Sequence, residues 1–344
     1  MEQLIYKSYA DAVKNALTNG KKRGDISKGL VTESFSNFSG SQGLSGLSSN
    51  DEKQDLNLFN SLEKLSDIAG KKAKYHESPG AHPDFSHLKN SNGTENHYIT
   101  SMFIDIKNST GLFRKYDPIA VANITTTIQK AAIHTCWYFD GYVQRFHGDG
   151  LFVYFGGKNM THEQSVKNAI NAASFFSYFI QNDLKNLFSE QGVEKIYTRI
   201  GIDTGKAEDV VWHLAGMKDC SEITTCSLHT SLASKMQFNA KSNGIMLGDY
   251  VKDNSSVSQD HFAIRVDPIT GKEDRYVFQI PEESFNYTQW EFNWERYLRK
   301  HPGIVADDNG NLYFKKPTVS VPNSNLNLDY LRSQTQGYKP SFNG

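Results

Sequence analysis

The stretches Ser101-Met-Phe-Ile-Asp-Ile-Lys-Asn-Ser-Thr110 and Val143-Gln-Arg-Phe-His-Gly-Asp-Gly-Leu-Phe-Val-Tyr-Phe155 decide the fold of this chain. In the first, an apolar run ends at Asp105 and a small polar turn follows, whose backbone N–H groups could contact phosphate. In the second, alternating apolar residues flank Gly148-Asp149-Gly150, which is the pattern of a β-hairpin whose two glycines supply the positive φ of the turn. We therefore predict two strand ends, each of which carries an aspartate.

The two aspartates converge if their strands are neighbours in one sheet. Two carboxylates a few ångströms apart are tolerated only with a shared proton or with cations between them. A pair of divalent metal ions, Mn²⁺ or Mg²⁺, is the natural occupant, because such a pair can activate one oxygen of a phosphate ester and neutralise a triphosphate. The simpler interpretation is two ordinary turn aspartates, but the glycines and strands around Asp105 and Asp149 favour metal binding.

Length and composition limit the class of protein. With 344 residues and 38% hydrophobic residues, the chain can bury a full core and has room for more than one unit. A net charge of −1 creates no global field toward nucleic acid or an anionic membrane. The three cysteines, Cys136, Cys220 and Cys226, form no even framework and no Cys-x-x-Cys pair, which indicates reduced thiols. Without a secretory leader or an apolar run of about 18 residues, we expect a soluble, cytoplasmic protein that requires neither nucleic acid nor a membrane.

Composition divides the chain into three parts. Residues 1–97 hold two amphipathic helical patterns, at 4–17 and 56–68, separated by a Ser-, Gly- and Asn-rich linker at 24–50. Residues 98–281 form the compact domain. Residues 282–344 form an aromatic- and Asn-rich C-terminal extension, which we expect to pack on that domain or on a dimer partner and to be extended after Lys316.

The compact domain alternates strands and helices. A strand ends at Asp105, a helix runs from Asp117 to Tyr138, the hairpin follows, and a second helix at 161–189 precedes a strand at 197–203. Strand, helix, hairpin, helix and strand in this order are typical of an α+β, ferredoxin-like (split βαβ) domain. We predict that fold.

Four motifs in register resemble those of the class III nucleotidyl cyclase catalytic domain over residues 98–280. They are Phe103-Ile-Asp-Ile106 with Ser109-Thr110, Gly148-Asp149-Gly150 with Phe155-Gly156, Arg199-Ile-Gly-Ile202 with Gly205, and Leu232-Ala-Ser-Lys235. The resemblance implies cyclisation of a nucleoside triphosphate to a 3′,5′-cyclic monophosphate with release of pyrophosphate. It also implies a homodimer whose sites are each assembled from two chains.

The same resemblance assigns roles to residues. Asp105 and Asp149 match the metal-binding aspartates, and the backbone carbonyl of Ile106 matches a further metal ligand. Ser109 and Thr110 occupy the turn that would contact the substrate phosphates.

The base-reading positions depart from the family pattern. Four residues before the hairpin aspartate the family usually has Lys for adenine or Glu for guanine, whereas this chain has Arg145; the partner position aligns with Thr224. An arginine offers only donors, which suits a pyrimidine carbonyl and provides no acceptor for guanine. Together with Tyr98, Arg145 resembles the pyrimidine cyclases of the Pycsar antiphage system. The implied substrate is UTP or CTP, and the product would act on a cyclic-nucleotide-responsive effector; Tyr98 could equally be a strand-start aromatic that packs on the sheet.

The transition-state positions also depart from the pattern. The family's asparagine and arginine align with Ser231 and Lys235, and Lys235 can place a point charge on a phosphate oxygen but lacks the bidentate fork. We interpret Arg199 as a solvated strand residue and His147 as a solvated turn residue. Two alternatives stay open, an adenylate cyclase and a catalytically silent nucleotide-binding sensor domain.

Overall fold

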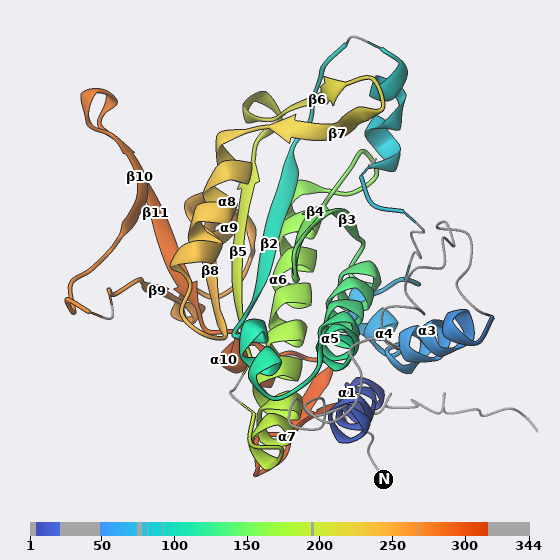
Figure 1. Ribbon diagram of the computed structural model, residues 1–344. Helices are drawn as coiled ribbons and strands as arrows, with labels where there is room; N and C mark the ends of the chain where they lie inside the picture. Colours follow the sequence, from blue (N-terminus) through green and yellow to red (C-terminus); the bar gives the residue numbers. More distant parts are fainter. Residues whose placement is uncertain are drawn as a thin grey trace, which may run out of the picture. The chain divides into compact units, whose positions relative to one another are not determined.

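The computed structural model describes residues 5–20, 49–73, 78–80, 82–91, 93–193, 196–267 and 269–315 (Figure 1). The predicted linker at 24–50, apart from its last two residues, and the predicted extended tail lie outside these ranges. The described residues up to Phe314 belong to one compact unit. All three cysteines are free.

The sheet at the centre of this unit has the predicted ferredoxin-like core. Its six elements are, in chain order, β2 (Ile99–Lys107), α5 (Pro118–Tyr138), β3 (Gly141–His147), β4 (Gly150–Phe155), α6 (His162–Tyr178) and β5 (Tyr197–Gly205). The strands lie in the order β5-β2-β4-β3, and each neighbouring pair is antiparallel. The prediction of strand, helix, hairpin, helix and strand is thus confirmed.

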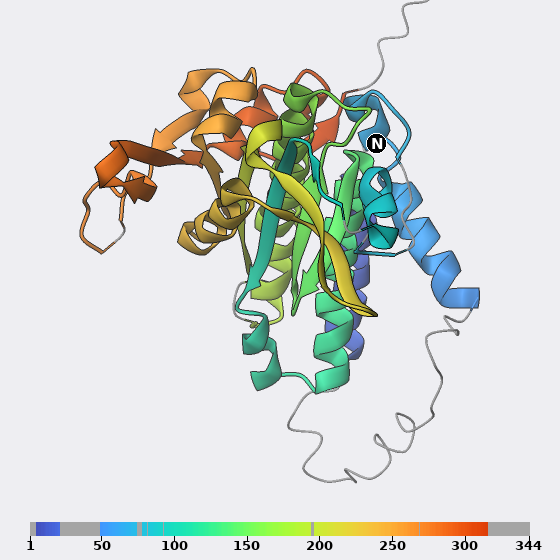
Figure 2. The same ribbon diagram turned by 90° about the horizontal axis from the view of Figure 1, so that it is seen from above.

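Further strands extend the sheet beyond β5. There β8 (Gly244–Gly248) runs parallel to β5, and β11 (Phe285–Phe292) pairs with β8. β9 (Phe262–Ile264) and β10 (Tyr276–Ile280) pair with β11. The remaining strands are β1 (Glu95–Asn96), β6 (Val211–Met217) and β7 (Cys220–Cys226), which form a separate sheet, and β12 (Ile304–Ala306) with β13 (Leu312–Phe314). Seen from above, the β6–β7 ribbon crosses the main sheet (Figure 2).

The two faces of β2 have different neighbours, because successive side chains of a strand point to opposite faces. Ile104 is 4% exposed and belongs to the apolar core that includes residues of α5 and α6. Phe103 pairs in register with Gly201 of β5. At Gly201 an added Cβ would lie 2.1 Å from the carbonyl oxygen of Ala233, so α8 (Leu228–Asn239) packs directly on this opposite face. Asp105 is two residues beyond Phe103 and therefore shares the face of α8.

Local signals set the helix boundaries. The Asp117 side chain accepts a hydrogen bond from the Ala120 N–H, at 2.7 Å, and caps α5, and Thr161 caps α6. The predicted helix at 161–189 is interrupted: a π-helical turn, Phe179–Leu184, separates α6 from α7 (Lys185–Glu190). The remaining helical elements are η2 (Pro83–Asn90), η3 (Ser109–Arg114), η5 (Ala207–Asp209), α9 (Asp249–Asn254), η6 (Gln259–His261), η7 (Pro281–Glu283) and α10 (Trp294–Arg299).

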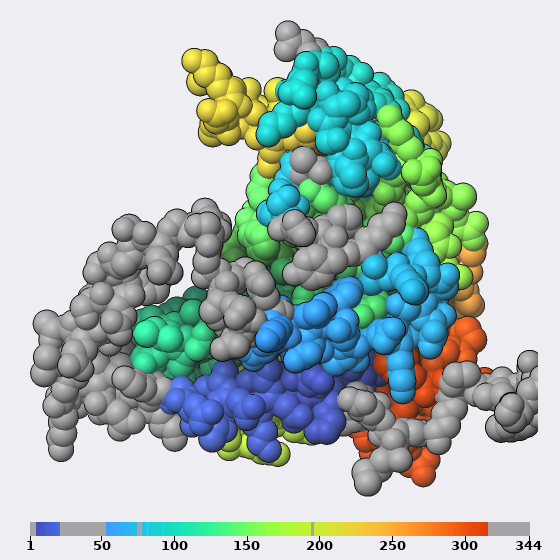
Figure 3. Space-filling model, turned by 90° about the vertical axis from the view of Figure 1, so that its right-hand side faces the viewer, coloured from blue at the N-terminus to red at the C-terminus, as the bar shows by residue number. Residues whose placement is uncertain are grey.

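The N-terminal helices cover α5 (Figure 3). α1 (Lys7–Asn19) is anchored where the Tyr6 hydroxyl bonds the Thr135 hydroxyl at 2.8 Å and the Tyr9 hydroxyl bonds His134 Nδ1 at 2.6 Å. The helix predicted at 56–68 appears as two helices, α3 (Ser49–Ser61) and α4 (Leu65–Ala69). The divisions at 97/98 and 281/282 stay predictions, although both flanking segments contact the central domain through α1 and β11.

Candidate active site

The fold brings the ends of β2 and of the β3–β4 hairpin together. β2 and β4 are antiparallel neighbours, and Ile104 lies opposite Leu151. Asp105 follows Ile104, and Asp149 is the second residue of the turn between His147 and Gly150. The predicted convergence of the two aspartates depended on their strands being neighbours, and this condition is confirmed.

The two glycines of the hairpin have different functions. Gly148 has a φ of 61°, as predicted. Gly150 is not among the described residues with positive φ, so that part of the prediction is wrong. Glycine is required there because a Cβ would lie 2.5 Å from the carbonyl oxygen of Ile104 and 3.5 Å from the Cα of Asp105. The hairpin therefore lies so close to the backbone at Ile104 and Asp105 that only glycine fits at position 150.

Asp105 has an ion-pair partner that the sequence interpretation missed. Nε and Nη2 of Arg199 both donate to Oδ2 of Asp105, at 3.1 and 2.5 Å. The Arg199 side chain is only 20% exposed, and its guanidinium lies 5.6 Å from the ring centroid of Phe238. The interpretation of Arg199 as a solvated strand residue is wrong, because the antiparallel register places it directly opposite Asp105.

The polar turn after β2 forms the short 3₁₀ helix η3. Asn108 precedes it with a φ of 71°, Ser109 is half-buried and Thr110 is exposed. Both residues thus lie a few positions beyond Asp105, at the same end of β2. The side chain of Ile106 is buried, which leaves its backbone as the group that could bind a ligand.

These groups suit hard cations. Carboxylates and a backbone carbonyl are the oxygen ligands that Mg²⁺ and Mn²⁺ prefer, and both bonds from Arg199 end on Oδ2 of Asp105. In the described part of the chain, no three His, Cys, Asp or Glu side chains come together as a metal-binding group. Asp105, Asp149 and the carbonyl of Ile106 are thus the groups that could hold a divalent metal ion.

Arg145 also has a partner that the sequence interpretation did not identify. It forms a two-pronged ion pair with Glu222 of β7, in which Nε donates to Oε2 at 3.1 Å and Nη2 contacts Oε1. Thr224 lies two residues beyond Glu222 on β7, where its hydroxyl is 3.2 Å from the Tyr154 hydroxyl. The structure thus brings Arg145 and Thr224 into one cluster, with Glu222 between them.

Tyr98 lies far from Arg145 along the sheet within one chain. Arg145 is opposite Phe152, and Phe152 is opposite Phe103, five residues beyond Tyr98 along β2. At about 3.3 Å per residue, that separation is roughly 17 Å. The Tyr98 hydroxyl donates to the carbonyl of Met160, and its ring stacks on His162 at 4.8 Å. These are the contacts of a strand-start aromatic, the alternative that the sequence left open; a role in base selection stays a prediction.

The family-aligned residues of α8 lie on its exposed surface. Lys235 is exposed, and its Nζ lies 5.6 Å from the ring centroid of Phe278. Ser231 is exposed one helical turn earlier and donates to the carbonyl of Ser227, at 3.2 Å. Neither has a contact with Asp105 among the described interactions.

A buried polar group fixes α8 on the sheet. Asp203 of β5 is fully buried, pairs through Oδ2 with His229 Nδ1 of α8 at 2.9 Å, and accepts a bond from the Tyr287 hydroxyl at 2.7 Å. Burial raises the pKa of Asp203, and the bonds from His229 and Tyr287 oppose that rise. Because α8 also carries Lys235, this group positions part of the predicted site.

His147 has the environment expected for a turn residue near an arginine. Burial and the neighbouring Arg145 charge lower the pKa of His147.

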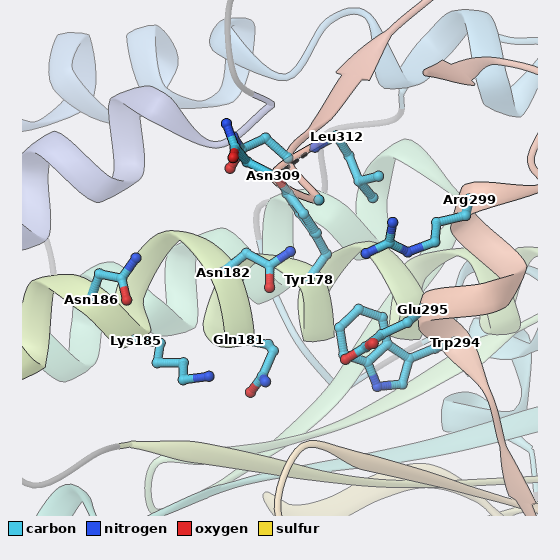
Figure 4. A pocket seen from close by; sticks show the side chains of 12 residues that line it. Tyr178, Gln181, Asn182, Lys185, Asn186, Trp294, Glu295, Arg299, Asn309 and Leu312 are labelled. Carbon is cyan, nitrogen blue, oxygen red and sulfur yellow. Dashed lines mark hydrogen bonds between the residues drawn. The ribbon is translucent and has the colours of Figure 1, made fainter. Parts of the chain in front are cut away.

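A separate polar cavity of about 280 Å³ lies between the π-helical turn, α10 and the loop before β13 (Figure 4). Its lining does not include the predicted site residues. Among the described residues, no helix has the length and apolar character of a membrane span.

Comparisons with known proteins place the chain in a family. The model of the adenylate and guanylate cyclase catalytic domain matches residues 92–280. A cytidylate cyclase from Staphylococcus aureus is 35% identical over 259 residues, which are 74% of this chain and 60% of the relative. A cytidylate cyclase from Escherichia coli is 32% identical over 252 residues, 71% of this chain and 54% of the relative. The chain therefore spans little more than half the length of these relatives. The crystal structure of the adenylyl cyclase CyaB from P. aeruginosa aligns with a TM-score of 0.47 and 17% identity, over 58% of this chain and 95% of that one.

Proposed function

Because this chain belongs to the adenylate and guanylate cyclase catalytic domain family, we propose that it converts a pyrimidine nucleoside triphosphate to the 3′,5′-cyclic monophosphate and pyrophosphate. The observation that carries the proposal is the approach of the Gly148-Asp149-Gly150 turn to the backbone at Asp105.

In the reaction, the ribose 3′-hydroxyl loses its proton to solvent and its oxygen bonds to the α-phosphorus, while the bond from that phosphorus to the β-phosphate oxygen breaks and pyrophosphate leaves. Asp105, Asp149 and the carbonyl of Ile106 would hold two Mg²⁺ or Mn²⁺ ions, which supply Lewis-acid activation and neutralise phosphate charge. The N–H groups at the start of η3, with Ser109 and Thr110, contact the phosphates. Lys235 of the second chain places its charge near the oxygen on which negative charge develops.

The base is held by Arg145 and Thr224. Both relatives reported above carry the name cytidylate cyclase, which favours CTP over UTP as the substrate of this chain. The product would be a signal for a cyclic-nucleotide-responsive effector in the cytoplasm, and the resemblance to the Pycsar cyclases suggests antiphage defence. The exposed position of Lys235 on α8 leaves its charge accessible to a site completed by a second chain, and we propose a homodimer.

The test is to incubate the purified protein with each of the four ribonucleoside triphosphates and Mn²⁺ or Mg²⁺, and to identify the product by chromatography. We expect a cyclic pyrimidine nucleotide. Asp105→Ala and Asp149→Ala should each reduce turnover at least about a hundredfold, because metal catalysis supplies several kcal/mol and about 1.4 kcal/mol is tenfold. Asp308→Ala, which changes an exposed aspartate, is the matched control.

The outcomes separate the candidate functions. Turnover above about a hundredth of wild type in Asp105→Ala or Asp149→Ala, with Mn²⁺ present, refutes the metal assignment. Conversion of ATP in preference to UTP and CTP makes the chain an adenylate cyclase. Nucleotide binding without turnover identifies the silent sensor domain, the alternative that Ser231 and Lys235 left open.

A further inference from the structure

The two-pronged pair between Arg145 and Glu222 joins the main sheet to the separate sheet that contains β7. Arg145 is on β3, Glu222 is on β7, and the side chains are 45% and 26% exposed. The pair therefore lies at a surface where both members can contact a ligand. Glu222 and Thr224 point to the same face of β7, because they are two residues apart on one strand.

The pair retains hydrogen-bonding capacity beyond its internal bonds. A guanidinium has five N–H donors and a carboxylate has about four acceptor sites. The two contacts between Arg145 and Glu222 use two of each. The outer edge of the pair can therefore present a carboxylate acceptor followed by guanidinium donors.

That order of groups complements one pyrimidine. The base-pairing edge of cytosine presents the N4 amine as donor and then N3 and O2 as acceptors, and a glutamate is a recurrent acceptor for N4. We infer that Glu222, together with Arg145, reads the base and selects cytosine over uracil. The inference rests on the proposed function, since it assumes a pyrimidine substrate.

Uracil fits the same edge poorly. Its O4 acceptor would face the Glu222 carboxylate, which is also an acceptor. Its N3–H donor would face an N–H donor of Arg145, so two of the three positions on the base edge could form no hydrogen bond. A buried polar group without a complementary partner lowers affinity more than a missing apolar contact does. Specificity would therefore come from repulsion of uracil as well as from attraction of cytosine.

The test measures kcat/KM for CTP and UTP in the full-length chain carrying Glu222→Gln. The amide replaces one acceptor by a donor, so CTP turnover should fall about ten- to a hundredfold, while UTP turnover falls less or rises. The ratio of kcat/KM for CTP to kcat/KM for UTP should thus fall about ten- to a hundredfold. Arg145→Lys keeps the positive charge but loses the two-pronged geometry of the guanidinium. This change on β3 should also lower the ratio of kcat/KM for CTP to that for UTP. The matched control is Glu273→Gln, which alters an exposed Glu–Arg pair with Arg275 outside the site.

The outcomes are distinct from failure of the proposed function. If wild type turns over neither pyrimidine triphosphate, the proposed function fails. If wild type uses both pyrimidines but prefers UTP, or if Glu222→Gln keeps the wild-type ratio of kcat/KM for CTP to that for UTP, the inference alone is overturned. Equal losses on CTP and UTP would show that Glu222 only positions Arg145 and would also refute base reading. A melting temperature within the range of the control identifies variants that are folded.

Discussion

Replacing Gly150 by alanine tests the geometry of the metal site without removing a ligand. The added Cβ would lie 2.5 Å from the Ile104 carbonyl oxygen, whereas a carbon–oxygen contact normally requires about 3.3 Å. The hairpin must therefore move away from β2 by roughly 0.8 Å, and Asp149 moves with it. Because a misplacement of about 1 Å can cost about a hundredfold in rate, we expect kcat to fall about ten- to a hundredfold.

The assay combines turnover of the preferred triphosphate with Mn²⁺ binding measured by electron paramagnetic resonance. Gly150→Ala should bind Mn²⁺ more weakly and retain its far-ultraviolet circular dichroism. The control is Gly148→Asn at the neighbouring position, where the φ of 61° is one that Asn tolerates and a Cβ would meet no described atom within 4 Å. It should lose much less activity. Wild-type turnover and Mn²⁺ affinity in a folded Gly150→Ala protein would refute the convergence of Asp105 and Asp149.

Two further predictions concern assembly and pH. Mixing an Asp105→Ala chain with a Lys235→Ala chain should restore partial activity, because one of the two sites in a mixed dimer contains neither substitution; no recovery in a sample shown to contain mixed dimers would contradict composite sites. Burial raises the pKa of Asp183 from 3.8 to about 7. The folded state therefore binds this proton more tightly than the unfolded state does. The stability that the bound proton contributes is fully present below about pH 4 and is lost as the pH rises through about 7. Asp183→Asn should therefore raise the unfolding free energy at pH 8 by up to about 4 kcal/mol, with little change at pH 4; equal effects in denaturant titrations at both pH values would contradict the buried-carboxyl explanation.

The sequence predicted the core of the fold because its signals are local. Asp117-Pro118 and Thr161 are capping signals that act within one helical turn. The hairpin follows from Gly148-Asp149-Gly150 and the alternating residues beside it. The π-helical turn at Phe179–Leu184 has no comparable local signal, and the pairing of β11 with β8 joins segments about 40 residues apart. Such pairing depends on tertiary packing, which a single sequence does not show.

The sequence also predicted the position of the aspartates in the candidate site, but not their ion-pair partners. Placing Asp105 near the hairpin required only that two strands be neighbours, and β2 and β4 are. The ion pairs could not be predicted, because Arg199 is 94 residues from Asp105 and Glu222 is 77 residues from Arg145. Each pair depends on strand register or on how β7 crosses β3. The usual solvent exposure of arginine therefore misled the interpretation of Arg199.

The ion pair of Arg145 changes the argument about the base. Considered alone, Arg145 offers only donors, which makes guanine the least suitable base. Glu222 supplies an acceptor, and a carboxylate can accept from N1–H and N2 of guanine while the guanidinium donates to O6. Arg145 therefore does not by itself disfavour guanine, and the support for a pyrimidine comes from the cytidylate cyclase relatives. For this reason GTP is as important in the substrate panel as CTP and UTP: conversion of GTP would leave the pairing of Arg145 and Glu222 intact as a base reader and would overturn the pyrimidine proposal.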